Sequence, residues 1–154
     1  MEKYLLKLIV ENERGVMARI ATLLSRKGYN IQSICVGKHM QSGVSSIILT
    51  IRGSDDEVEQ AKNQLGKLIN VIEAGLFLEK DIVEREIALL KVKNSTALKG
   101  KLKDFGGKII LERNGNAIVE IIDKPEKVEE FVKRAMKELE VIDISRSGTN
   151  AIDA

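Results

Sequence analysis

The chain of 154 residues contains one cysteine, one histidine, one proline and no tryptophan. A disulfide needs two thiols and a structural zinc needs four nitrogen or sulfur ligands, so neither can be built within one copy of the chain. Aromatic residues make up only 3%, which leaves few side chains that could stack on bases. We therefore expect no metal site and no nucleic-acid partner.

The chain also lacks a large excess of positive or negative charge and has no long hydrophobic run. Lys and Arg number 25 against 23 Asp and Glu, a net charge of +2 that gives no strong field for a polyanion. No apolar run approaches the roughly 20 residues that span a bilayer, and the first residues lack a signal-peptide pattern. We expect a cytoplasmic protein with no membrane partner.

The first half of the chain alternates strand and helix patterns in the order β-α-β-β-α-β. Strands are predicted over residues 4–10, 31–36, 44–51 and 71–77. A helix is predicted from Val16 until Gly28 stops it, and a second helix follows the capping box formed by Ser54 and Glu57.

The second half repeats the same order. Strands are predicted over residues 87–92, 108–112, 117–122 and 141–144. One helix carries Leu98, Leu102 and Phe105 on one face, and the other starts at Pro125, where proline is tolerated as a first helical residue.

These two halves predict an α+β protein built from two ferredoxin-like βαββαβ sandwiches. We assign residues 1–78 to the first domain, 79–83 to a junction and 84–154 to the second domain. Apolar residues also face away from the helices in strands 5–10 and 47–51, and one small unit cannot bury them by itself. We therefore expect a partner sheet, in the same chain or in a second copy, to cover the outer sheet face.

The turn after the first strand has the composition of a small-molecule site. The amides of Gly15, Val16 and Met17 begin a helix, where unpaired N–H groups and the helix dipole attract a carboxylate. Asn12 and Asn30 each offer a donor and an acceptor, a combination that suits the two charged groups of an amino acid. We expect this turn and the start of the second strand to face each other. The same residues also suit an ordinary turn, and spacing alone leaves both interpretations open.

The residues of this region resemble those of the regulatory, or small, subunit family of acetohydroxyacid synthase, also called acetolactate synthase. The resemblance to the ACT domain of that family rests on Glu11-Asn12-Glu13, Gly15, Arg19-Ile20, Leu23 and residues 28–33. Residues 83–86 resemble its junction and residues 146–148 its closing segment, so the resemblance covers nearly the whole chain.

The resemblance implies a non-catalytic protein with no catalytic residues and no cofactor of its own. Its expected partner is the catalytic large subunit, which would carry thiamine diphosphate, Mg and FAD. The small subunit would form a homodimer through its ACT domains and raise the activity of the partner. It would also confer feedback inhibition by a branched-chain amino acid, with valine expected first, in valine, leucine and isoleucine biosynthesis.

The family places the effector between two ACT domains whose sheets join side by side. This implies a set of effector-binding residues in this chain: Asn12, Gly15, Val16, Met17, Asn30 and Ile31. Cys35 and Gly37 fall in a segment that the family also places near the effector. The second half has Asn94-Ser95-Thr96-Ala97 in place of the first turn, so we expect it not to bind effector in the same manner.

Two alternatives remain at the level of sequence. One is another amino-acid-sensing ACT protein that regulates a different enzyme. The other is an acylphosphatase-like enzyme, in which an Arg of the first turn holds phosphate and an Asn on a later strand orients water. Arg14 is present, but residues 44–51 contain no Asn.

Overall fold

The computed structural model describes residues 2–154. The chain forms two compact units, one made of residues up to 83 together with 149–154 and the other of residues 84–148. The predicted division differs from this at the carboxy terminus. The last six residues pack with the first unit, whereas the sequence pattern placed them in the second domain.

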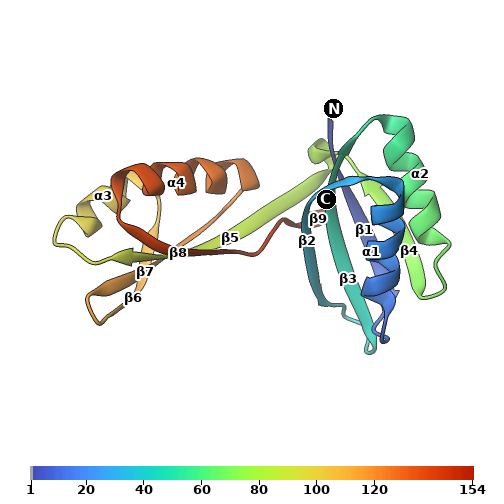
Figure 1. Ribbon diagram of the computed structural model, residues 1–154, viewed down its shortest axis with the longest axis horizontal. Coiled ribbons are helices and arrows are strands. Elements are labelled where there is room, and N and C mark those ends of the chain that lie inside the picture. The colour runs from blue at the N-terminus through green and yellow to red at the C-terminus, as the bar shows by residue number, and fades with distance from the viewer. Residues whose placement is uncertain (1) are drawn as a thin grey trace. The chain divides into compact units, whose positions relative to one another are not determined.

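The first unit has the predicted β-α-β-β-α-β order (Figure 1). Its elements are β1 Glu2–Glu11, α1 Val16–Lys27, β2 Asn30–Lys38, β3 Val44–Gly53, α2 Asp55–Gly66, β4 Val71–Phe77 and the short 3-10 helix η1 Glu79–Asp81. The four strands pair antiparallel in the order β2-β3-β1-β4. This is the ferredoxin-like sandwich that the sequence predicted.

Both helices of this unit cover one face of its sheet. Val16, Ile20 and Leu24 form the buried stripe of α1, and they pack into one cluster with strand residues such as Leu6 and Leu49. The α1 helix ends at Gly28, whose φ of +69° is a left-handed conformation that suits glycine.

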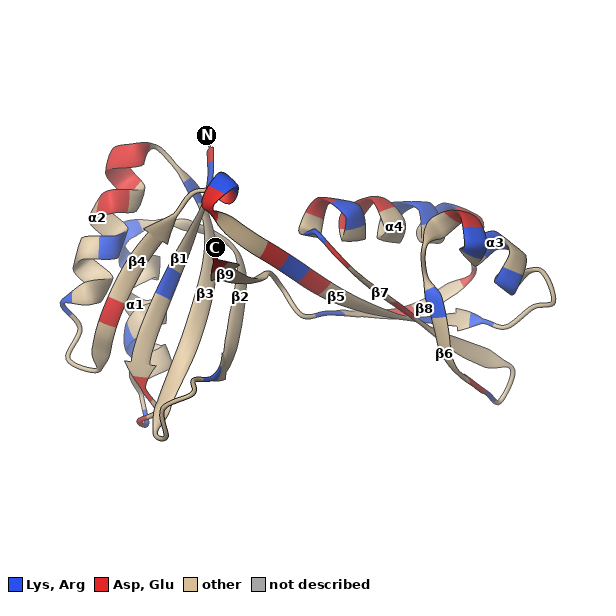
Figure 2. Cartoon of the chain, turned by 180° about the vertical axis from the view of Figure 1, so that it is seen from behind, with Lys and Arg blue, Asp and Glu red and all other residues tan. Residues whose placement is uncertain are grey.

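The predicted capping box at the start of α2 is present. The Glu57 amide donates to Ser54 Oγ, and the Ser54 amide donates to Glu57 Oε2 at 2.8 Å. The Glu57 carboxyl accepts hydrogen bonds from Ser54, and these lower its pKa. The bond from the Ser54 backbone amide has the largest effect and the bond from the Ser54 hydroxyl the next. Figure 2 shows acidic residues gathered at this end of α2, where they complement the helix dipole.

The second unit repeats the topology. Its elements are β5 Ile82–Lys93, α3 Leu98–Phe105, β6 Lys108–Arg113, β7 Asn116–Asp123, α4 Pro125–Glu138 and β8 Val141–Arg146. The strands pair antiparallel in the order β6-β7-β5-β8. No helix within residues 2–154 is long and apolar enough to cross a membrane.

The core of the second unit lies between its sheet and its two helices. Strand β5 alternates strictly, with Ala88, Leu90 and Val92 buried, as expected for a strand with one face on the core. Phe105 and Phe131 meet edge to face with ring centroids 6.2 Å apart.

A strand that the sequence did not predict, β9 Asn150–Asp153, follows the second unit. It belongs to the first unit and pairs with β5, whose first two residues, Ile82 and Val83, are part of that unit. The Ala154 amide donates to the Asp81 carbonyl at 3.1 Å. It covers the sheet face opposite the helices, where Leu5 and Ile48 are buried. The sequence predicted a partner sheet on this face; at Leu5 and Ile48 the same chain supplies a single four-residue strand instead.

Candidate functional site

The turn between β1 and α1 is held in place by backbone and side-chain bonds from two other loops. The Asn12 amide donates to the Gly43 carbonyl at 2.8 Å, which joins the turn to the β2–β3 loop. The Glu11 amide donates to the Asn70 carbonyl at 2.9 Å, and Asn70 Nδ2 donates to Glu11 Oε2 at 2.8 Å. Arg19 donates to Asn70 Oδ1 as well. Asn70 was not predicted as a site residue, because a single Asn after a helix carries no sequence signal that it will hydrogen-bond to a turn far away in the chain.

Helix α1 starts with a left-handed residue and has no side-chain cap. Gly15 has a φ of +83°, a conformation that costs any residue with a Cβ. The sequence predicted that the Val16 amide is unpaired. In the structure this amide makes one long hydrogen bond, to the Glu13 carbonyl at 3.4 Å. The Val16 side chain is buried, whereas Asn12, Gly15 and Met17 are exposed. The turn therefore offers backbone donors on an exposed surface and an apolar side chain beside them.

The predicted site residues do not all come together within one chain. Asn30 pairs with Arg52 at one end of the sheet, whereas Glu11 pairs with Val44 at the other end. Helix α1 has 12 residues and spans about 18 Å, which separates its first turn from the strand that follows it. The expectation that the first turn and the start of β2 face each other is therefore wrong for a single copy.

Gly37 and Cys35 lie further along β2. Gly37 pairs with Ser46, which also pairs with Ile9 of β1, so Gly37 is at the same end of the sheet as Asn12. Cys35 pairs with Ile48 and shares its sheet face. That face is the one opposite the helices, so the Cys35 thiol points away from α1.

Strand β2 forms one edge of the sheet. It exposes Ile31, Ile34 and Val36, each between 38% and 50%. An edge strand with unpaired backbone groups and exposed apolar side chains is a template for pairing with another strand.

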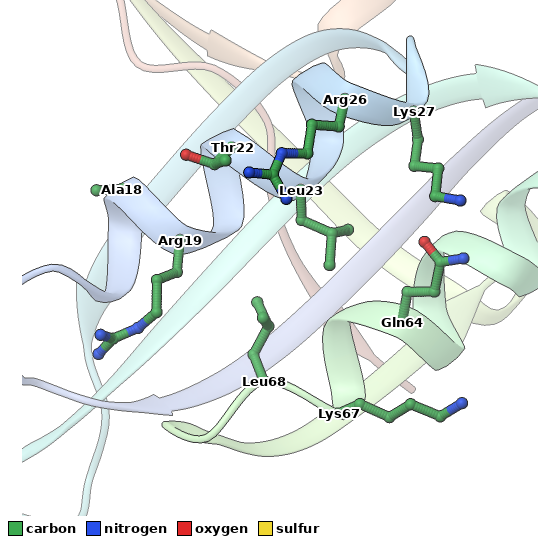
Figure 3. A pocket seen from close by; sticks show the side chains of 9 residues that line it. All are labelled: Ala18, Arg19, Thr22, Leu23, Arg26, Lys27, Gln64, Lys67 and Leu68. Atoms are coloured by element: carbon green, nitrogen blue, oxygen red, sulfur yellow. The ribbon is translucent and has the colours of Figure 1, made fainter.

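A cavity of about 580 Å³ lies between α1 and α2, and none of the predicted effector residues lines it (Figure 3). Leu23 and Leu68 form part of its apolar lining, and four cationic side chains also line it: Arg19, Arg26, Lys27 and Lys67. Gln64 also lines it, and Gln64 Oε1 is buried without a hydrogen-bond partner among the described residues.

The turn at the equivalent place in the second unit has a different geometry. Ala97 precedes α3 with a φ of −82°, an ordinary right-handed value, in contrast to Gly15. Asn94 Nδ2 donates to Glu112 Oε1 at 3.0 Å, so this amide already has a partner within the unit. The two turns share a topology but not a backbone conformation.

Comparison with known proteins identifies the family. Residues 6–73 match the AHAS small subunit-like ACT domain, and residues 85–154 match the small subunit of acetolactate synthase. The acetolactate synthase small subunit of Mycolicibacterium smegmatis is 33% identical over 96% of this chain and 88% of its own length. The chain belongs to the acetolactate synthase small-subunit family. The small subunit of Bacillus subtilis is 32% identical over 97% of this chain and 89% of its own.

A solved structure supports the same conclusion. The crystal structure of the acetolactate synthase small subunit from Thermotoga maritima covers 100% of this chain and 98% of its own, with 33% identity and a TM-score of 0.90. The predicted family, fold class and regulatory, non-catalytic character are confirmed by these relatives. They favour this family over an ACT regulator of a different enzyme and over an acylphosphatase-like enzyme.

Proposed function

We propose that this small subunit binds the catalytic large subunit of acetolactate synthase, activates it, and inhibits it when a branched-chain amino acid is bound. Valine is the effector we expect first. The observation that carries the proposal is the first turn, where Gly15 holds the start of α1 in an exposed, left-handed conformation within a chain of this family. Thiamine diphosphate, Mg and FAD would belong to the catalytic partner.

The effector site in this proposal is completed by a second copy. Since Asn30 and Gly37 lie seven residues apart on β2, the two parts of the site are roughly 20 Å apart in one chain. Antiparallel pairing of two β2 edges around Ile34 would bring Asn30 and Ile31 of one copy beside the first turn of the other. The exposed apolar side chains of β2 support this pairing, because it would bury them.

The turn suits the chemistry of such an effector. Backbone N–H groups at the start of α1 favour the carboxylate, and the asparagine side chains offer acceptors for the ammonium. A few charge-assisted hydrogen bonds at about 1.5–3 kcal/mol each, with burial of a valine side chain at about 1.5–3 kcal/mol, suffice for micromolar affinity.

Inhibition requires a path from this site to the catalytic partner. In our proposal, rearrangement of the paired ACT domains reaches the second unit through residues 78–86. Because a ligand shared by two copies binds the paired form better, it shifts the equilibrium toward that form.

The test combines calorimetry, sedimentation and activity. The purified chain is titrated with valine, leucine and isoleucine, with alanine as a control that keeps the charged groups but has a one-carbon side chain. We expect heat from at least one branched-chain ligand, little from alanine, a larger dimer fraction with ligand, and inhibition of the reconstituted enzyme. Absence of activation of the catalytic subunit, or of binding by all three ligands, would refute the proposal.

A further inference from the structure

The carboxy-terminal residues return from the second unit to the first. Residues 146–154, which we call the return segment, begin in the second unit and end in the first, with the change at Gly148 and Thr149. Gly148 has a φ of +75°, so the chain turns there in a conformation that favours glycine. The return segment is a second covalent connection between the units, besides the one that leads into β5.

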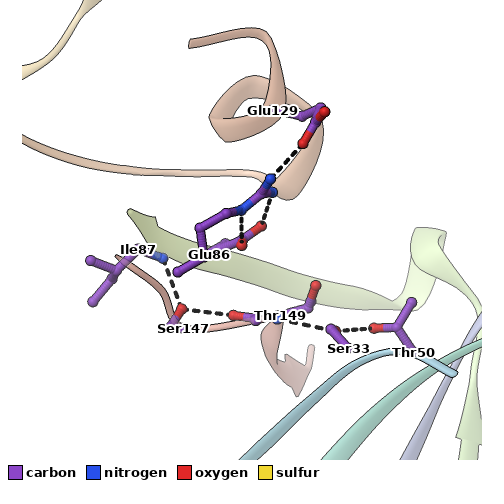
Figure 4. A network of polar contacts seen from close by, with 9 residues as sticks. Ser33, Thr50, Glu86, Ile87, Glu129, Ser147 and Thr149 are labelled. Atoms are coloured by element: carbon purple, nitrogen blue, oxygen red, sulfur yellow. Dashed lines mark hydrogen bonds and ion pairs between the residues drawn. The ribbon is translucent and has the colours of Figure 1, made fainter. Parts of the chain in front are cut away.

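On the first unit, the return segment is bonded to strand β2. The buried Thr149 donates its amide to Ser33 Oγ at 3.3 Å, and Ser33 Oγ donates to the buried Thr50 Oγ1 at 3.0 Å (Figure 4). Beyond Thr149, Lys7 forms an ion pair with Asp153 at 3.1 Å, and this bond lowers the pKa of the Asp153 carboxyl. The end of the chain is therefore fixed on the outer face of the ACT sheet.

On the second unit, the same segment is bonded to β5. The Ile87 amide donates to Ser147 Oγ at 3.0 Å, and Ser147 Oγ donates to the Gly148 carbonyl at 2.7 Å. Arg146 donates Nε and Nη2 to the two carboxylate oxygens of Glu86, at 2.8 and 3.0 Å. Glu86 is 5% exposed, and its hydrogen bonds raise the pKa of Arg146. A paired, bidentate contact of this kind fixes position as well as charge.

The contact with β2 lies beside a predicted effector residue. The register of β2 against β3 shifts between Ile31 and Ser33, which indicates a bulge at this point. A bulge re-aims the side chains around it and bends the strand. Ser33, whose hydroxyl accepts from Thr149, therefore lies two residues from Ile31 on the same strand, directly across this bulge.

We propose that the return segment couples the effector-binding strand to the second unit, with Ser33 as the positioning residue at which the coupling begins. This inference rests on the proposed effector function. It adds a route separate from residues 78–86: β2 moves Ser33, Ser33 holds Thr149, and the chain carries the displacement through Gly148 to Ser147 and the Arg146–Glu86 pair.

The experiment compares effector binding with effector inhibition in the small subunit reconstituted with its catalytic partner. Ser33→Ala removes the acceptor of Thr149. Thr50→Val is the matched control, because it removes the other partner of Ser33 while leaving Ser33 able to accept from Thr149. A chain ending at Gly148 removes the contact altogether. Each variant is measured for the Kd of valine by calorimetry, for activation without valine, and for the valine concentration that gives half-inhibition.

We expect Ser33→Ala to raise the half-inhibitory concentration by about fivefold or more while the Kd and the activation stay unchanged. The control Thr50→Val should keep all three values, and the enzyme reconstituted with the shortened chain should be activated but not inhibited by valine. If the shortened chain does not fold, the comparison of Ser33→Ala with its control Thr50→Val decides whether the inference holds. The inference would be overturned if the Ser33→Ala variant had the same half-inhibitory valine concentration as the unaltered protein. It would also be overturned if valine binding and inhibition were lost in parallel. An unaltered protein that binds no effector would instead refute the proposed function, and the inference with it.

Discussion

Replacing Gly15 by aspartate should remove effector inhibition at valine concentrations that inhibit through an uncharged variant, while leaving activation of the catalytic subunit in place. The added carboxylate would lie at the start of α1, where the effector carboxylate is expected to bind. Asparagine at the same position is the matched control, because it has nearly the same shape, tolerates left-handed backbone equally well and carries no charge.

The magnitude follows from the local geometry. A Cβ at Gly15 would have Arg19 Nη1 as its nearest neighbour at 3.9 Å, which is ordinary contact, so neither variant is excluded by space. The φ of +83° costs a side chain about 1 kcal/mol, and both variants share this cost. A second carboxylate about 5 Å from the effector carboxylate adds about 1–3 kcal/mol of repulsion, or about 5- to 150-fold in affinity.

The assay is calorimetry with valine on both variants, with thermal unfolding to verify that their stabilities match. We expect any loss of valine affinity in the asparagine variant to be no larger than the backbone cost of about 1 kcal/mol that both variants share. The aspartate variant should bind valine more weakly than the asparagine variant. Reconstituted enzyme should be activated by both and inhibited through the asparagine variant only. Equal affinities for the two variants would refute the placement of the effector carboxylate at this turn.

Three further changes test the packing and the buried polar groups of the two units by denaturant unfolding of the full chain. Gly107→Ala places a Cβ 2.7 Å from the Phe131 ring, and we expect a loss of about 1–3 kcal/mol; unchanged stability would show that the ring moves freely. Gln64→Leu removes a buried oxygen that has no hydrogen-bond partner in the described part of the chain, so stability should hold or rise by up to about 1 kcal/mol, and a marked loss would argue that a ligand or water is held there. Glu86→Gln weakens two bonds from Arg146, and we expect a loss of about 1.5–3 kcal/mol, with no loss contradicting a structural role for the pair.

Local patterns in the sequence were sufficient to predict most of the fold. The apolar stripe of α1 predicted the helix and Gly28 its end, and the capping box at Ser54 predicted the start of α2, because these signals depend on neighbouring residues alone. The repeat of the same order in the second half predicted a second copy of the topology. Each of these features forms from contacts within one unit.

The features that the sequence did not predict depend on contacts between distant segments. Strand β9 has four residues, too few for a periodic pattern, and its place is fixed by bonds such as that of Lys7 to Asp153, which lie 146 residues apart. The separation of Asn30 from Gly15 has a different cause, which the predicted length of the helix between them already implied. The two segments flank one helix, and the length of that helix puts them at opposite ends of the sheet.

The turns that follow the first strand of each unit differ in a way that supports ligand binding at one of them and not at the other. Gly15 takes a left-handed conformation that only glycine adopts without strain, whereas Ala97 at the corresponding place is right-handed. The second turn also uses its asparagine internally, since Asn94 donates to Glu112. Because the backbone and the amide of that turn serve its own unit, the capacity to bind a ligand is expected at the first turn and not at the second.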